Sequence, residues 1–183
     1  MRLDAIEPAA DFLSAILPGT FTTQPGTYAD YRALAHFHYA PGHPVTQAGI
    51  WKIVYRDDAR ARLVAVGVLS YPTPACKQRE RALGLGGPRY GPKLLFVNAH
   101  VRTISRVIVH PQFRALGIAS ALVRRVCRDC PTRYVEAIAA MGEVHPFFER
   151  AGMRRMGERY FIFDRQTEKS LSTNQHESSR IKE

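Results

Sequence analysis

The stretch Val107-Ile-Val-His-Pro-Gln-Phe-Arg-Ala-Leu-Gly-Ile-Ala119 decides the fold of this 183-residue chain. An apolar strand passes through a proline turn into an Arg-x-x-Gly-x-Ala loop that opens a helix. Gly117 and Ala119 leave room for a ligand to approach the backbone, and the first N–H groups of a helix have no partner within it. Because the helix dipole adds partial positive charge there, the loop predicts an anion site suited to a pyrophosphate.

The spacing of this loop differs from two common phosphate loops, since the P-loop needs Gly-Lys-Ser/Thr and the dinucleotide fingerprint needs three glycines. Arg114-Ala-Leu-Gly117-Ile-Ala119 instead resembles the acyl-CoA loop of the GNAT superfamily of N-acetyltransferases. An apolar strand over 133–139 follows, and Pro146-Phe-Phe-Glu-Arg-Ala-Gly-Met153 is similar to the superfamily's closing Phe-Tyr-Glu-Lys-x-Gly-Phe element. The resemblance implies a mixed α/β (α+β) GNAT fold in which two neighbouring parallel strands splay apart to hold acyl-CoA.

The same resemblance implies a set of cofactor-binding residues and an acetyl-CoA co-substrate. Pantetheine would pair with the backbone of the central strand at Val107 and Val109. The residues expected around the pyrophosphate are Arg114, Leu116, Gly117, Ile118, Ala119 and Ser120.

Acetyl transfer to an amine needs a base for the amine, a donor to the oxyanion and often an acid for the thiolate. Many members of the superfamily supply that acid from the Tyr of Phe-Tyr, but the matching residue here is Phe148, which has no proton to give. Glu136 lies within an apolar strand, where a carboxylate must be paired, neutral or at work, and it is our leading base candidate. Other polar candidates, each with an alternative structural role, are His38, Tyr39, Ser105 and His100.

Metal, zinc or redox chemistry finds little support in the sequence. His36, His38 and His43 have no carboxylate or thiolate nearby, so we predict no metal site. Cys127 and Cys130 form one Cys-x-x-Cys without a second such pair, and with Cys76 they are expected to be thiols.

Composition favours one globular domain. Hydrophobic residues make up 45% and charged residues 23%, and 183 residues suffice for a full core. No apolar run approaches the roughly 18 residues of a membrane span, and the N-terminal residues lack the apolar centre of a signal peptide. We therefore expect a cytoplasmic protein with a single domain over 1–165 and a disordered polar tail over 166–183.

The net charge of +10 belongs to the predicted domain, because three basic and three acidic residues cancel within the tail. This excess suggests an acidic partner such as DNA or RNA, although a solvated basic surface explains it nearly as well. The cations expected to line such a surface are Lys77, Arg79, Arg81, Arg89, Lys93 and Arg102.

Hydrophobic periodicity predicts the remaining elements. The expected order is a strand at 3–6, a helix at 8–17, a helix from Tyr28 to about Tyr39 capped by Thr27, a hairpin of 49–56 and 63–71, a long loop at 72–92, a strand or short helix at 94–101, strands at 102–109 and 133–139, a helix at 145–151 and a final strand pair within 153–163.

Three functions compete on this sequence. The first is an acetyl-CoA-dependent N-acyltransferase that acts on an amine. The His38-Tyr39 element and Ser105 also resemble a GNAT-like branch that includes phage Mom-type proteins, which implies an enzyme that modifies a nucleobase in DNA or RNA. The third is a non-catalytic module that binds CoA or nucleic acid, for which Phe148 is the one positive sign.

Overall fold

The computed structural model describes residues 19–39, 42–87, 90–139 and 146–167. The strand expected at 3–6, the helix at 8–17 and the tail beyond residue 167 lie outside these ranges. The described elements are β1 (Thr20–Pro25), α2 (Tyr28–Leu34), the 3₁₀ turn η1 (Ala35–Phe37), β2 (Gly49–Arg56), β3 (Ala61–Ser70), α3 (Lys77–Leu83), α4 (Tyr90–His100), β4 (Val101–Val109), the 3₁₀ turn η2 (Pro111–Phe113), α5 (Ile118–Asp129), β5 (Tyr134–Ile138), α6 (Phe147–Arg150), β6 (Arg154–Arg155) and β7 (Tyr160–Asp164).

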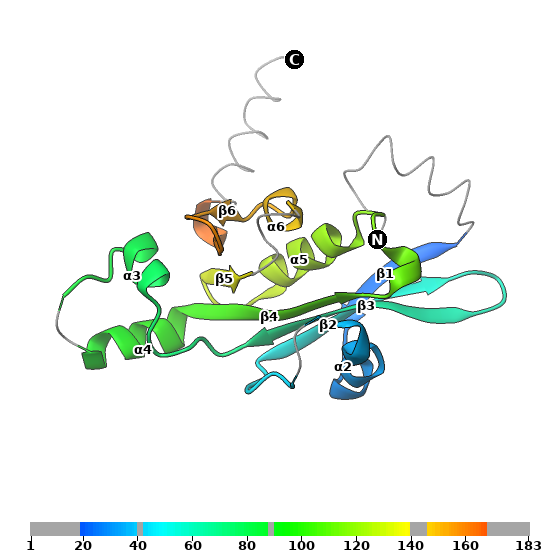
Figure 1. Ribbon diagram of the computed structural model, residues 1–183, viewed down its shortest axis with the longest axis horizontal. Coiled ribbons are helices and arrows are strands. Elements are labelled where there is room, and N and C mark those ends of the chain that lie inside the picture. The colour runs from blue at the N-terminus through cyan, green and yellow to red at the C-terminus, as the bar shows by residue number, and fades with distance from the viewer. Residues whose placement is uncertain (1–18, 40–41, 88–89, 140–145, 168–183) are drawn as a thin grey trace, which may run out of the picture.

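The seven strands of the described ranges form one mixed sheet in the order β1-β2-β3-β4-β5-β7-β6. All neighbouring strands are antiparallel except β4 and β5, which run parallel and are connected through α5. Helix α5 lies on one side of the sheet and α2 on the other (Figure 1). This arrangement confirms the mixed α/β fold that the GNAT resemblance implies.

The main hydrophobic core lies between α5 and the sheet. Leu122, Val123 and Val126 of α5 are buried against residues of β3, β4 and β5. A Cβ placed on Gly67 of β3 would lie 3.4 Å from Leu122, so the missing side chain lets α5 approach the strand closely. Apolar burial of this kind is the main favourable contribution to folding, and it fixes α5 beside β4.

Helix α2 covers the opposite face through Tyr31 and Leu34. Thr27 caps it as predicted: its hydroxyl accepts the Asp30 N–H at 3.3 Å, and the Asp30 carboxylate accepts the Thr27 N–H at 2.7 Å. The helix was expected to reach Tyr39, but it ends at Leu34 and continues only as η1. Its buried side chains end there, and the backbone is already extended at His38.

The region between β3 and β4 differs most from its prediction. The stretch 72–92, expected as a loop, contains α3, and the ambiguous segment 94–101 is helical as far as His100. Ala82 and Leu83 of α3 pack against Tyr160 and Ile162 of β7, which gives the short helix a buried side. Helices α3 and α4 lie together at one end of the molecule (Figure 1).

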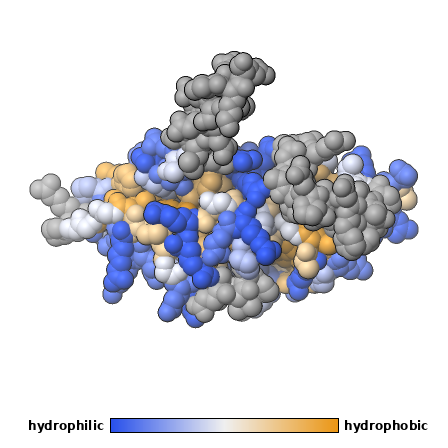
Figure 2. Space-filling model, turned by 90° about the horizontal axis from the view of Figure 1, so that it is seen from above, coloured by the Kyte–Doolittle hydropathy of each residue, from blue (hydrophilic) through white to orange (hydrophobic). Residues whose placement is uncertain are grey.

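Apolar residues reach the surface at the end that holds α3 and α4, whereas polar residues cover much of the centre of this view (Figure 2). Leu95 is 73% exposed and Tyr90 is 59% exposed. All three cysteines are buried thiols that form no disulfide, as the sequence predicts. Among the described helices, none combines the length and apolar character that crossing a bilayer requires.

Candidate acyl-CoA site

An opening between β4 and β5 is the central feature of the site. The two strands pair from Val101↔Tyr134 to Ile104↔Ala137, and their pairing ends there. Strand β4 continues to Val109, held on its other side by β3 as far as Ala65↔Val109. In the described part of the chain, the β5-facing backbone edge of β4 beyond Ile104 therefore has no neighbouring strand. Val107 and Val109, the residues expected to bind pantetheine, lie on this edge.

Ser105 marks the closed end of the opening. The register of β3 and β4 shifts there, since Leu69 faces Ile104 whereas Val68 faces Arg106. Such a bulge inserts one extra residue and bends the strand. The Ser105 Oγ lies 2.7 Å from the Ser70 Oγ and donates to the Val68 carbonyl at 3.3 Å.

The loop that follows β4 presents backbone groups at the other end of the opening. Gly117 caps α5 in the left-handed conformation, with φ of 76°, and no side chain caps the helix. Ala115 is also left-handed, with φ of 64°, which is unfavourable for a residue with a Cβ. The side chains of Ile118 and Ser120 are buried, and Leu116 packs against the α5 core. With Ala119 partly exposed beside them, these residues offer N–H groups rather than side chains to an anion.

Arg114 has a structural role in this conformation. Its Nε donates to the Val109 carbonyl at 3.2 Å, and its Nη2 donates to the Phe37 carbonyl at 3.4 Å. The side chain thereby ties the loop to the end of β4 and to η1. In this conformation the guanidinium is bound to backbone carbonyls, so it is not positioned for the expected contact with a phosphate.

His38 and Tyr39 lie just beyond η1, on the face opposite α5. Phe37 packs with Ile108 of β4, and its ring centroid lies 4.9 Å from that of His110. The His38 ring stacks on the Tyr39 ring at 4.6 Å, and Tyr39 is 65% exposed. The 3₁₀ turn η1, which His38 directly follows, thus lies beside the half of β4 that β5 leaves unpaired.

Glu136 occupies a buried network and does not fit the role of a free base. It is 1% exposed, and both carboxylate oxygens are occupied. Oε1 accepts from Arg79 Nη2 and Thr103 Oγ1, both at 2.7 Å, while Oε2 accepts from Arg79 Nε at 2.9 Å and the Tyr160 hydroxyl at 2.8 Å. Our leading base candidate is therefore corrected to a structural carboxylate.

The network also stabilises particular protonation states. Burial and the negative charge of Glu136 raise the pKa of Tyr160 far above its usual value, so the phenol stays protonated and donates. Burial alone would lower the pKa of Arg79, but its hydrogen bonds to Glu136 and the carboxylate charge raise that pKa. Arg79 is 1% exposed, so the prediction that it belongs to a basic surface is wrong.

His100 is not brought to the opening. It ends α4 beside Phe96, with ring centroids 4.8 Å apart, and borders a surface pocket with Pro131 and Arg133. At about 3.3 Å per strand residue, it lies roughly 16 Å along the chain from Ser105. The Phe148 ring is buried and stacks on Phe161 at 4.9 Å, so it serves the core.

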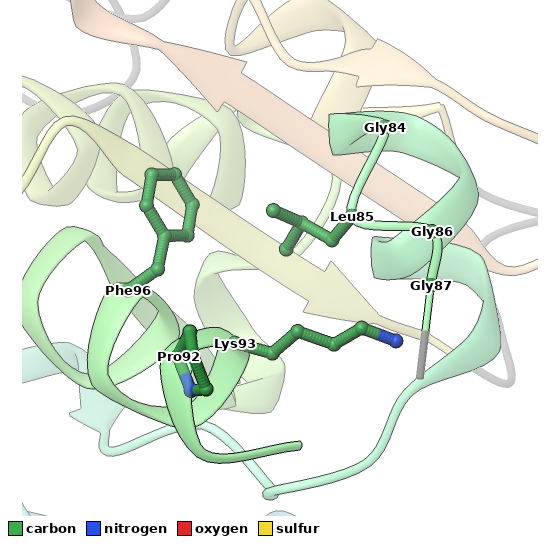
Figure 3. A pocket seen from close by; sticks show the side chains of 7 residues that line it. All are labelled: Gly84, Leu85, Gly86, Gly87, Pro92, Lys93 and Phe96. Atoms are coloured by element: carbon green, nitrogen blue, oxygen red, sulfur yellow. The ribbon is translucent and has the colours of Figure 1, made fainter. Parts of the chain in front are cut away.

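A larger open pocket of about 370 Å³ lies between the loop after α3 and the first turns of α4. Leu85 and Phe96 point toward one another across it (Figure 3). Lys93 also borders it and pairs with Glu80 at 3.6 Å. This pocket belongs to the region between β3 and β4, and none of the expected cofactor-binding residues lines it.

Comparisons with known proteins agree with this geometry. Residues 75–153 match the family described as "Acetyltransferase (GNAT) family". The structure of the KacTA–DNA complex is similar, with 15% identity, a TM-score of 0.51, and coverage of 85% of this chain and 99% of that chain. A Tyr-to-Phe mutant of the AtaT toxin, bound to the C-terminus of the antitoxin AtaR and acetyl-CoA, shares 15% identity at a TM-score of 0.50, with coverage of 84% and 98%.

At such identities these two structures show the fold alone, and no curated protein sequence matches the chain. The family match itself spans β4, the loop that follows it, α5 and β5. Residues 75–153 of the chain are therefore similar to the GNAT acetyltransferases, the acetyl-CoA-dependent N-acyltransferases.

Proposed function

We propose that acetyl-CoA lies along β4 in the opening, with its pyrophosphate at the first turn of α5 and its thioester near Ser105. The observation that carries this proposal is the end of β4–β5 pairing at Ile104↔Ala137 while β4 continues to Val109. Backbone groups left without a strand partner are strong hydrogen-bonding groups, and pantetheine amides suit them. Gly117 and the following N–H groups suit the pyrophosphate.

The acceptor in this proposal is an amine that approaches from the face opposite α5, where His38 and Ser105 lie. The amine nitrogen attacks the thioester carbonyl carbon, and the C–S bond then breaks to release the CoA thiolate. One proton leaves the amine, and one is taken up by the thiolate. His38 is the base that we assign to the amine proton, because imidazole accepts protons near neutral pH. Ser105 is assigned to substrate contact.

The proposed function can be tested by an assay that does not assume which amine is the acceptor. The purified protein is incubated with acetyl-CoA and separate pools of polyamines, peptides, tRNA and DNA, and each pool is searched by mass spectrometry for acetyl mass shifts. We expect a shift on a primary amine in one pool. Failure to bind acetyl-CoA, together with unchanged pools, would contradict the proposal.

Changing His38 to Gln is expected to lower kcat by about a hundredfold at neutral pH, because general bases contribute that much or more. Acetyl-CoA affinity should stay unchanged, since His38 does not belong to the cofactor loop. The measurement is steady-state kinetics on the acceptor found in the pools. His100→Gln is the matched control, because His100 ends α4 far from the opening. Equal losses in both variants would remove His38 from the mechanism.

A nucleic acid that carries the acceptor amine is a second candidate. The Arg102 guanidinium lies 4.4 Å from the centroid of the Tyr71 ring, which is 51% exposed. Exposed Lys77 and Arg81 lie on α3 in the same insertion between β3 and β4. An exposed aromatic ring beside cations suits base stacking and phosphate contacts.

Charge reversal on α3 tests this second candidate. If duplex DNA binds there, log affinity should fall with log salt by about 0.9 per neutralised phosphate, and Arg81→Glu should reduce that slope by about 0.9. Fluorescence anisotropy with a mixed-sequence duplex measures both quantities. Arg60→Glu is the control, because this exposed cation precedes β3 at the opposite end of the molecule (Figure 1). Equal slopes for the two variants would place the basic residues of α3 outside any nucleic-acid site.

A further inference from the structure

The opening begins after Ile104, and side-chain hydrogen bonds connect β4 to β5 just before this residue and to β3 just after it. Thr103 pairs with Glu136 of β5, directly before the last pair of the two strands, and its hydroxyl donates to the Glu136 carboxylate at 2.7 Å. Two residues further on, the Ser105 hydroxyl lies 2.7 Å from the hydroxyl of Ser70 on β3. Strand β4 is thus attached to β5 at Thr103 and to β3 at Ser105.

The acceptor of the Thr103 hydrogen bond is held in place from two further elements. Arg79 of α3 binds both Glu136 oxygens in a bidentate pair, and the Tyr160 hydroxyl of β7 donates to Oε2. Arg79 itself is anchored by donation to the Thr73 carbonyl at 2.8 Å. A carboxylate with all these partners has one orientation, so its bond to Thr103 fixes β4 relative to β5.

We propose that Thr103 and Glu136 are positioning residues that set where β4 and β5 part, and thereby align the pantetheine and thioester of acetyl-CoA along β4. This inference rests on the proposed function, because it requires acetyl-CoA in the opening. It also assigns a role to α3: the helix supplies Arg79, which orients the carboxylate. Neither residue touches the reacting atoms in this account, and each acts through the position of the strand.

Two variants, each of which removes one hydroxyl that donates to the Glu136 carboxylate, distinguish an effect on the position of β4 from an effect on the stability of the protein. Thr103→Val removes the hydrogen bond to Oε1 and keeps a β-branched side chain, whereas Tyr160→Phe removes the hydrogen bond to Oε2. Of these two residues, only Thr103 lies on a strand that borders the opening, since Tyr160 belongs to β7. We expect Thr103→Val to weaken acetyl-CoA binding about tenfold, which is the effect of a lost or misaligned hydrogen bond. Tyr160→Phe should weaken binding much less, because Arg79 still orients the carboxylate through both of its oxygens. Isothermal titration calorimetry measures both affinities.

A cofactor fragment supplies a readout that a loss of stability would not explain. Adenosine 3′-phosphate 5′-diphosphate contains the pyrophosphate but lacks pantetheine, so Thr103→Val should bind it as wild type does. Thr103→Ser restores the hydroxyl and should restore acetyl-CoA binding. If Thr103→Val does not fold, Thr103→Ala removes the hydroxyl without added bulk and makes the same comparison.

The outcomes distinguish this inference from the function on which it rests. Wild-type protein that binds acetyl-CoA, with Thr103→Val and Tyr160→Phe equally affected or both unaffected, would overturn the positioning role and leave the proposed function standing. Weaker fragment binding by Thr103→Val would overturn it as well. Wild-type protein that fails to bind acetyl-CoA would overturn both. A selective loss of acetyl-CoA affinity in Thr103→Val, recovered by Thr103→Ser, supports the inference.

Discussion

Arg79→Met is expected to destabilise the protein by about 3–5 kcal/mol, the usual cost of leaving a buried charge without its partner. The guanidinium supplies two of the four hydrogen bonds to Glu136, and both side chains are 1% exposed. Methionine removes the positive charge and keeps a long apolar side chain. Urea unfolding followed by circular dichroism measures the change in unfolding free energy.

Two matched variants show whether burial of the charge causes this loss. Arg133 forms a similar bidentate pair with Asp164, but their side chains are 41% and 26% exposed, so Arg133→Met should destabilise the protein far less than Arg79→Met. The double variant Arg79→Met with Glu136→Met removes both buried charges and should recover much of the stability. A loss for Arg79→Met no larger than that for Arg133→Met would contradict the buried network.

Gly117→Val is expected to weaken acetyl-CoA binding by at least about a hundredfold, because loss of one or two charge-assisted hydrogen bonds costs this much. Gly117 has φ of 76°, a conformation that a β-branched residue strongly disfavours. A side chain here also stands where the pyrophosphate would approach the first N–H groups of α5. Calorimetric titration of the folded variant with acetyl-CoA measures the affinity.

Gly84 provides a control for the backbone strain alone. It ends α3 with φ of 63°, and a Cβ there would meet nothing within 4 Å. Gly84→Val should therefore carry a similar conformational cost, about 1–2 kcal/mol, without any change at the cofactor loop. If both valine variants fold and bind acetyl-CoA equally well, the pyrophosphate does not lie at Gly117.

The strand, loop and helix around Gly117 could be predicted from sequence because their requirements are local. A glycine that must adopt positive φ, an apolar strand before it and an amphipathic helix after it all lie within one short stretch. The capping box of Thr27 and Asp30 is readable for the same reason, because its partners are three residues apart. The hairpin of β2 and β3 likewise shows in alternating apolar residues around a polar turn.

The surroundings of Glu136 could not be predicted in this way. Arg79 is 57 residues away along the chain and stands in a basic cluster that resembles a solvated surface. Only the sheet order, which places β7 beside β5, brings Tyr160 to the same carboxylate. The buried Glu136 had to be paired, neutral or reactive, and the sequence offered no means to choose between a distant cation and a substrate. Strand β1 was missed because it is a largely exposed edge strand with little apolar content.

The strand order also has a consequence for the order of assembly during synthesis. Strands β1 to β4 are sequential neighbours and can pair as each emerges, which keeps their contacts local. Strand β7 instead pairs between β5 and β6. One edge of β5 therefore lacks its strand partner until β7 has been synthesised. Until residue 160 has been made, the Glu136 carboxylate lacks its Tyr160 partner. The C-terminal half of the sheet, and with it one wall of the opening, is therefore completed by β7, which is made last among the described strands.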